Sequence, residues 1–327
     1  MLAYGKLPPA ILDRLLGRIP RRDARVVVGP RIGEDAAVID FGDRYLVAKS
    51  DPVTFAAERI GWYAVQVNAN DLATMGARPR WFLATLLLPR GDPSLAEAVF
   101  ADLLAACEEL DISLCGGHTE VTPGLDRPIV AGHMLGEVEK ERLVRKERIR
   151  PGDVVLLTRG VALEGTAILA REKAGELAGR LEAALLERAR NLLFRPGISV
   201  VADALAACAA APVHGMHDPT EGGLIGGLYE LAAAAAAGLA VDSSRIPVLP
   251  ETAAICSLLD LDPLRLIASG ALLIAVAPDD ERRVVETLAA RGTPVAAIAT
   301  VMPPAHGLRL DSAPFAFPDR DEITKLF

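Results

Sequence analysis

The sequence predicts an α/β protein, in the mixed α+β sense, that is built from two domains. Its 327 residues are enough for two domains of ordinary size, each with its own core. The composition is 51% hydrophobic but only 4% aromatic, which favours alternating helices and strands over a sandwich or an aromatic-lined barrel. A charged segment at about residues 139–153 divides the chain. We therefore expect domains at residues 1–148 and 149–327.

The charge and the apolar runs exclude several classes of function. A net charge of −8 leaves no excess of Lys and Arg for phosphate backbones, so we expect no nucleic-acid partner. No apolar run approaches the roughly 20 residues of a membrane span, and the N-terminus does not resemble a signal peptide. We therefore expect a cytoplasmic protein without a membrane partner. The four cysteines are widely spaced and are most simply reduced core thiols.

The stretch from Val67 to Pro79, VNANDLATMGARP, predicts a buried helix that carries polar side chains. Apolar residues recur on both sides of this helix, so neither face suits water. Asn68 and Asp71 stand three residues apart and therefore point the same way. A buried carboxylate needs a counter-charge or several donors. Asp71 could form a salt bridge with an arginine such as Arg78, or it could belong to a ligand site.

A hairpin is predicted before this helix, because two apolar runs flank the turn Gly42-Asp43. If Phe41 faces Arg44, the register brings Asp35 and Asp51 to the open end of the hairpin, close enough to share one cation. Each aspartate alone could be an ordinary turn or strand-end residue. Together they repel each other unless a positive charge lies between them.

The rest of the first half alternates strands and helices. We expect a strand at Trp81 to Leu88, a helix at Ser94 to Leu110 that is capped by its first residue, and a strand at Ile112 to Cys115. A glycine-rich turn at Gly116 to Gly124 follows, whose backbone could approach a ligand closely. His118 in this turn could contact a phosphate or a metal, or it could be a hydrogen-bonded structural residue.

In the second half, the segment that begins at His214 is the most informative. Asp218, Pro219 and Glu221 fit the N-cap, N1 and N3 positions of a helix, which predicts a capping box. The same helix N-terminus, with Gly222, could also receive a phosphate. The other elements expected here are strands at residues 154–158, 271–277 and 295–301 and helices at residues 163–174, 181–193, 200–211 and 279–291.

The sequences and the order of these motifs resemble those of a known protein superfamily. GEDAAVI, SDP, NDLATMGARP, GGHT and HDPTEGGL follow one another as in AIR synthase (aminoimidazole ribonucleotide synthase), thiamine monophosphate kinase, selenophosphate synthetase and the hydrogenase maturation protein HypE. The second half looks most like HypE, through HGMHDPTEGGLIGGLYELA, IPVLPET and LDLDPLRLIASGALLIAVA. The resemblance implies a two-domain AIR synthase-like fold. Its N-terminal domain binds ATP and forms a homodimer, and its C-terminal domain is α/β.

The resemblance also implies ATP and Mg²⁺ as cofactors and a set of site residues. Aspartates of the first three motifs would bind Mg²⁺ and the ATP phosphates, an aspartate of the second half would lie near them, and the Gly-Gly-His-Thr segment would contact the nucleotide. Mg²⁺ suits this assignment because it prefers carboxylates together with substrate phosphates. The residues are Asp35, Asp51, Asp71 and Asp218 for the metal, Asp71 and Asp218 for catalysis, and Asp35, Asp51, Asn70, Asp71, Gly116, Gly117, His118 and Thr119 for the nucleotide.

The chain also departs from HypE at two places. HypE uses a C-terminal cysteine, whereas this chain ends Ile-Thr-Lys-Leu-Phe, and Ala268-Ser269-Gly270 stands where HypE has Asn-Glu-Gly. We expect an enzyme that phosphorylates an oxygen of an amide, carbamoyl or phosphate-type acceptor, with hydrogenase maturation and a partner protein from that process as its context. The alternatives are a nucleotide-binding HypE paralogue that acts as a non-catalytic partner or regulator, and a kinase or synthetase of the thiamine monophosphate kinase or selenophosphate synthetase type.

Overall fold

The computed structural model describes residues 5–20, 22–54, 58–91 and 93–326, and it confirms the mixed α/β class. The chain forms two compact units. The N-terminal unit comprises Arg22–Gly29 and Asp35–Leu143, and the C-terminal unit comprises Met1–Arg21, Pro30–Glu34 and Val144–Phe327. This division differs from the expected domains 1–148 and 149–327, since two short N-terminal segments belong with the second half of the chain.

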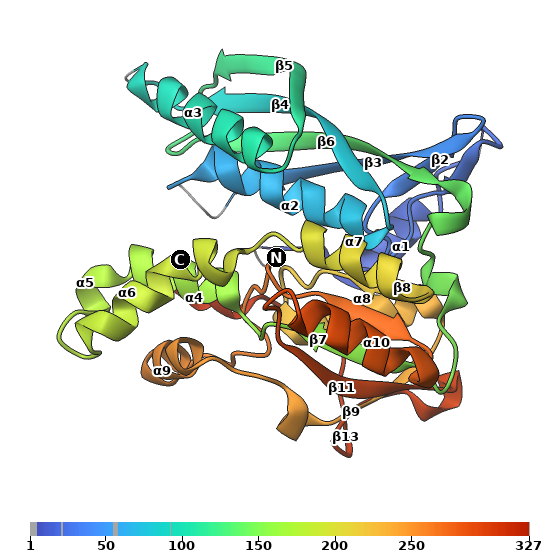
Figure 1. Cartoon of the computed structure of the whole chain (residues 1–327). Coiled ribbons are helices and arrows are strands. Elements are labelled where there is room, and N and C mark those ends of the chain that lie inside the picture. The colour runs from blue at the N-terminus through green and yellow to red at the C-terminus, as the bar shows by residue number, and fades with distance from the viewer. Residues whose placement is uncertain (1–4, 21, 55–57, 92, 327) are drawn as a thin grey trace. The chain divides into compact units, whose positions relative to one another are not determined.

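The N-terminal unit is a six-stranded sheet with two helices packed on it (Figure 1). The strand order is β1-β2-β3-β6-β4-β5. Its elements are β1 (Val26–Val28), β2 (Ala37–Asp40), β3 (Arg44–Val53), α2 (Ile60–Thr74), β4 (Arg78–Leu88), α3 (Ser94–Glu109), β5 (Ser113–Val121), β6 (Ile129–Glu139) and the 3₁₀ turn η1 (Lys140–Arg142).

Helix α2 confirms the buried helix that the sequence predicts. Every residue of α2 except Val67 is buried, and α2 packs on β3, β6 and β4 and against α3. A Cβ atom at Gly61 would lie 2.4 Å from the carbonyl oxygen of Val99, so the two helices approach backbone to backbone. The expected cap of α3 is wrong, because the N-cap position is occupied by Pro93 and not by Ser94.

The predicted hairpin register is confirmed, because the amide of Phe41 donates to the carbonyl of Arg44 at 3.0 Å and the β2–β3 pairing follows from there. The predicted glycine-rich turn is wrong at its start, since Gly116–Thr119 continue β5. This strand runs parallel to β4, to which α3 connects it. Gly117 has φ +149°, and a Cβ there would lie 2.0 Å from the carbonyl oxygen of Ala84. The glycine therefore permits a close strand approach rather than a turn.

The C-terminal unit is a seven-stranded sheet with the order β13-β12-β9-β11-β7-β10-β8. All its pairs are antiparallel except β12 with β9. The strands are β7 (Val154–Thr158), β8 (Val213–His217), β9 (Gly238–Val241), β10 (Leu273–Val276), β11 (Val295–Met302), β12 (Leu308–Leu310) and β13 (Ala313–Pro314).

Helices and short turns complete this unit, and those expected from the sequence are present. The helices are α1 (Pro9–Leu16), α4 (Leu163–Glu172), α5 (Ala174–Leu177), α6 (Ala183–Asn191), α7 (Val201–Ala210), α8 (Gly223–Ala235), α9 (Pro250–Leu259) and α10 (Pro278–Ala289). The shorter pieces are η2 (Lys146–Arg148), η3 (Leu193–Gly197), η4 (Ser243–Arg245), η5 (Pro304–His306) and η6 (Glu322–Lys325).

The predicted capping box at the start of α8 is wrong. The helix begins at Gly223, and its N-cap is Gly222 with φ +86°. Thr220 and Gly223 instead close a turn through a backbone hydrogen bond of 3.0 Å, which keeps Asp218 outside the helix. The capping carboxylate comes from Asp321, which accepts a hydrogen bond from the amide of Gly222 at 2.6 Å.

One stretch, Leu193–Ala210, is long and apolar enough to cross a membrane by length and composition. In the structure it is not one continuous helix, because Arg195 inside η3 has non-helical backbone angles and residues 198–200 between η3 and α7 are not helical. A third of the stretch is buried in the fold.

Candidate functional site

Two of the predicted aspartates of the N-terminal unit meet at one ammonium group. The Nζ atom of Lys49 lies 3.3 Å from Asp51 Oδ2 and 3.2 Å from Asp71 Oδ2. Lys49 and Asp51 are two residues apart on β3 and so face the same side of the sheet. Asp71 reaches them from α2, which packs against β3. The ion pair of Asp71 is therefore with Lys49 rather than with Arg78.

Asn68, another buried polar residue of α2, forms hydrogen bonds with the backbone of Asp51. Its Oδ1 accepts from the amide of Asp51 at 3.0 Å, and its Nδ2 donates to the carbonyl of the same residue at 3.2 Å. Gly132 on β6 makes room for this arrangement, because a Cβ there would lie 2.4 Å from Asn68 Nδ2. Asn68 therefore fixes Asp51 against α2 and has a structural role.

Asp35 joins the same group through the last turn of α2. Its carboxylate is buried, and the Oγ1 atom of Thr74 donates to its Oδ2 at 2.7 Å. The same hydroxyl also lies 2.7 Å from the carbonyl oxygen of Asp71. A hydroxyl has only one proton, so Thr74 shares it between these two acceptors. The structure thus brings Asp35, Asp51 and Asp71 to the C-terminal end of α2.

The electrostatics of this group favour a further cation. Burial raises the pKa of Asp71 to about 7; Lys49 opposes this rise, but the charges of Asp51 and Asp35 add to it. In the described residues, the buried Oδ2 atom of Asp71 accepts no hydrogen bond, although it lies in the ion pair with Lys49. Two carboxylates share the ammonium group of Lys49, the charge of Asp35 also acts on Asp71, and carboxylate oxygens are the ligands that Mg²⁺ prefers. The residues present therefore fit a divalent cation.

The remaining predicted nucleotide residues are Asn70, which precedes Asp71 on α2, and Gly116–Thr119, which lie apart from the aspartates. Asn70 is fully buried in α2. Gly116–Thr119 lie on the edge strand β5, and β6 and β4 separate this strand from β3. His118 is exposed, and its Nε2 lies 3.0 Å from Glu120 Oε2. A groove of about 350 Å³ runs beside this strand, with apolar side chains of α3 such as Phe100 and Leu103 in its lining.

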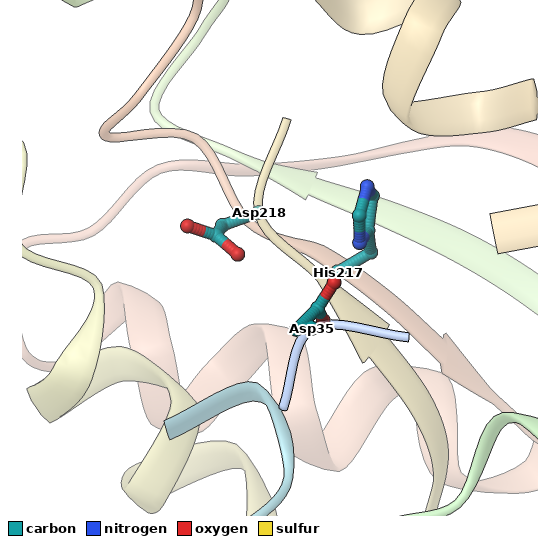
Figure 2. A group of neighbouring side chains, drawn as sticks. All are labelled: Asp35, His217 and Asp218. Atoms are coloured by element: carbon teal, nitrogen blue, oxygen red, sulfur yellow. The ribbon is translucent and has the colours of Figure 1, made fainter. Parts of the chain in front are cut away.

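In the C-terminal unit, Asp218 follows directly on β8 and is buried. Figure 2 shows that the side chains of His217 and Asp218 leave the end of β8 in different directions; it also labels Asp35, which belongs to the N-terminal unit. His217 is fixed on both sides of its ring. Its Nδ1 lies 3.2 Å from Lys146 Nζ, and its Nε2 lies 3.0 Å from Glu230 Oε2.

This contact pattern assigns the proton of the imidazole. An ammonium group can only donate, so Nδ1 of neutral His217 accepts from Lys146 and Nε2 carries the proton that is donated to Glu230. Although burial opposes ionisation, the charge of Lys6 and the hydrogen bonds from His217 and Lys6 lower the pKa of Glu230 to about 2. Lys6 Nζ lies 3.0 Å from this carboxylate. The residue before Asp218 is therefore held rigidly.

The structure places Lys49 at Asp51 and Asp71 and Lys146 at His217, and neither lysine was among the predicted site residues. Lys146 is 2% exposed and also donates to the carbonyl of Gly33, but it lies in the charged segment that divides the chain. The charge density of this segment predicted a domain boundary and gave no sign that one of its lysines is buried. Lys49 could have been found, since it stands two residues before Asp51 on a predicted strand.

Comparison with known proteins gives the family. The family model of the AIR synthase related protein, N-terminal domain, matches residues 33–138, and that of the C-terminal domain matches residues 150–309. The chain is 32% identical over 277 residues to the carbamoyl dehydratase HypE of Azotobacter vinelandii, a match that covers 81% of this chain and 76% of the relative.

Solved structures agree with this result at the level of the fold. The HypE–HypF complex contains a chain that superimposes with a TM-score of 0.76 at 18% identity, over 96% of this chain and 100% of that chain. A HypE solved in complex with ATP superimposes with a TM-score of 0.65 at 24% identity, over 94% of this chain and 91% of that chain. Both family domains are thus present in order, and the chain belongs to the AIR synthase-related family and, within it, is similar to HypE.

Proposed function

We propose that this protein is a HypE-like enzyme that uses ATP and Mg²⁺ to phosphorylate an oxygen of an amide, carbamoyl or phosphate-type acceptor. The observation that carries the proposal is the pair Asp51 and Asp71 at the ammonium of Lys49, with Asp35 linked to the same end of α2 through Thr74. Phosphoryl transfer needs little covalent chemistry from a protein, because positioning and charge neutralisation lower most of the barrier. An excess of carboxylates at one place supplies the metal ligands for that purpose.

The roles of these residues follow from their positions. Asp51 and Asp71 would hold the metal, Lys49 would keep them together and neutralise part of their charge, and Thr74 would orient Asp35. Bound Mg²⁺ would supply the charge that compensates the triphosphate oxygens. The HypE relative solved with ATP supports this assignment of the nucleotide.

We further propose that Gly116, Gly117, His118 and Thr119 contact the nucleotide. The groove beside them is of the size that small-molecule sites have in proteins, and apolar side chains of α3 line one of its walls. Asp218 of the C-terminal unit is proposed to act on the same phosphates, with Asp71, as the second catalytic carboxylate. Its burial directly after β8, beside a rigidly held His217, supports a fixed position for that role.

The biological setting that we propose is hydrogenase maturation in the cytoplasm. The relative from Azotobacter vinelandii is a carbamoyl dehydratase, and another HypE has been solved as a complex with HypF. Both findings support a maturation partner protein and an acceptor that carries a carbamoyl or amide group. We also propose a homodimer formed through the N-terminal units, since β5 is an edge strand with almost all its residues exposed.

Isothermal titration with a non-hydrolysable ATP analogue, with and without Mg²⁺, tests the proposal. We expect the affinity to rise with Mg²⁺ and this rise to be lost in Asp71→Asn, because the buried carboxylate is then neutral. Asp126→Asn is the matched control, since the Asp126 side chain is 89% exposed in the same unit. Binding of the analogue that does not respond to Mg²⁺ in the unaltered protein would rule the proposal out.

A second candidate is a HypE paralogue that binds nucleotide but acts as a partner or regulator. Ser269, which stands where HypE has a glutamate, favours it. An ATPase assay with carbamoyl, formamide and phosphate-ester acceptors separates the two candidates. Turnover that Asp71→Asn abolishes supports the enzyme, whereas tight ATP binding without turnover on any acceptor supports the regulator.

A further inference from the structure

The N-terminus of α8 takes its cap from the far end of the chain. Gly222 has no side chain with which to cap the helix, and the carboxylate of Asp321 accepts from its amide at 2.6 Å. The other oxygen of Asp321 accepts from the amides of Ile267 at 3.2 Å and Ile323 at 2.9 Å. Asp321 is 3% exposed. Its hydrogen bonds connect the C-terminal segment with the segments that contain Gly222 and Ile267.

The segment that carries Asp321 is itself anchored. The amide of Glu322 donates to the carbonyl of Arg265 at 3.2 Å, and the carboxylate of Glu322 accepts from the amide of Asp262 at 3.1 Å. Ile323, the next residue, has no exposed surface. Asp321 is therefore held in place by its neighbours, and its carboxylate can in turn fix the start of α8.

The loop between β8 and α8 connects the fixed start of α8 to Asp218. The loop turns back at once, because the amide of Gly223 donates to the carbonyl of Thr220 at 3.0 Å. Pro219 then packs on the first turns of α8, where a Cβ at Gly227 would lie 2.8 Å from its ring. Asp218 is thus fixed on one side by β8 and on the other by the N-terminus of α8.

We propose that Asp321 is a positioning residue for Asp218. The C-terminal segment Asp321–Ile323 would fix the position of the Asp218 carboxylate without contacting the substrate. The proposal rests on the catalytic role of Asp218 in the proposed function. A purely structural cap would also stabilise α8. The two roles differ in whether loss of the cap alters turnover through Asp218.

The variant Asp321→Asn tests this role in the full-length protein. Its amide group can still accept from two backbone amides, but it presents N–H instead of a carboxylate oxygen to the third. Asp319→Asn is the matched control, because Asp319 is exposed two residues earlier in the same segment. Hydrogen exchange of residues 217–226 measures the loop directly and requires no activity.

We expect faster exchange of residues 217–226 in Asp321→Asn and unchanged exchange in Asp319→Asn. We also expect kcat for ATP turnover to fall roughly tenfold to hundredfold, the loss typical of a displaced catalytic group, with a smaller effect on KM. In an Asp218→Asn background the second substitution, Asp321→Asn, should have no further effect on kcat, because both act through the same carboxylate.

Two results would overturn the proposal. One is exchange in Asp321→Asn that equals exchange in Asp319→Asn; the other is faster exchange with unchanged kcat, which leaves Asp321 as a cap alone. If Asp321→Asn does not fold, Asp321→Glu keeps the charge but lengthens the side chain, and the same two measurements apply. If the unaltered protein neither binds nor turns over ATP, the proposed function fails, and the exchange data still decide whether Asp321 holds the loop.

Discussion

Asp71 and Glu164 are two buried carboxyls whose pKa values are raised by the same cause, burial, but are held down by different partners. Burial raises the pKa of Asp71 to about 7, and nearby carboxylates add to the rise while Lys49 opposes it. Burial also raises the pKa of Glu164 to about 7, where hydrogen bonds from Ser269 oppose the rise and the charges of Glu221 and Asp321 add to it. Asp71 lies in a carboxylate cluster that suits a metal, whereas Glu164 belongs to the packing of the C-terminal unit.

Glu164→Gln tests the cost of this second buried carboxyl. Its pKa rises from 4.5 to about 7 on folding, so the stability that it contributes is complete below 4.5 and is lost as the pH rises through 7. Gln cannot ionise, so we expect the variant to keep its free energy of unfolding as the pH rises. At about pH 8 it should be more stable than the unaltered protein by up to about 3 kcal/mol. Urea unfolding across this pH range measures the difference.

The control for this prediction is Glu182→Gln, because Glu182 is exposed. Its unfolding free energy should change with pH as that of the unaltered protein does. A Glu164→Gln variant that is less stable than the unaltered protein at about pH 8 would contradict the prediction, since the ionised carboxylate would then be the favoured form.

At the scale of elements, glycines allow helices and strands of the N-terminal unit to pack closely against one another. Asn68 can reach the backbone of β3 only because Gly132 leaves space on β6. Gly117 lets β5 pass the carbonyl of Ala84. A Gly-rich segment predicts a turn or a ligand loop as readily as a close strand pair, so the local sequence did not distinguish these cases.

Gly132→Ala tests this close packing. The new methyl group would lie 2.4 Å from Asn68 Nδ2 and 2.7 Å from Phe82 Cζ, so either α2 or β6 must shift. We expect a loss of about 1–3 kcal/mol in the free energy of unfolding, the usual cost of overpacking a core. Gly91→Ala is the control, because a Cβ at Gly91 meets no atom within 4 Å. Equal stability of the two variants in urea would refute the prediction.

At the scale of the whole molecule, the two compact units allow ligand effects to be assigned to one of them. The only tryptophans, Trp62 and Trp81, both lie in the N-terminal unit. Their fluorescence therefore reports the unfolding of this unit alone. Far-UV circular dichroism, by contrast, follows both units, since each of them contains helices and strands.

We predict that ATP with Mg²⁺ stabilises the N-terminal unit. A ligand at one hundred times its Kd adds about 2.7 kcal/mol to the free energy of unfolding, provided that it binds only the folded state. The tryptophan transition should therefore move to higher urea in the unaltered protein and stay in place in Asp71→Asn. A shift of equal size in both proteins would show that the aspartates do not hold the ligand.

The fold class, the buried helix around Asp71, the hairpin register and the family could be predicted from the sequence. These follow from short-range patterns and from motifs, each of which a continuous stretch of chain carries. The spacing of Lys49 and Asp51 also indicated that these two residues face the same side of a strand. The folded structure was needed to show that Asp71 shares Lys49 with Asp51, that Lys146 is buried beside His217, and that Asp321 caps α8. These partners are far apart along the chain, and packing, not local propensity, brings them together.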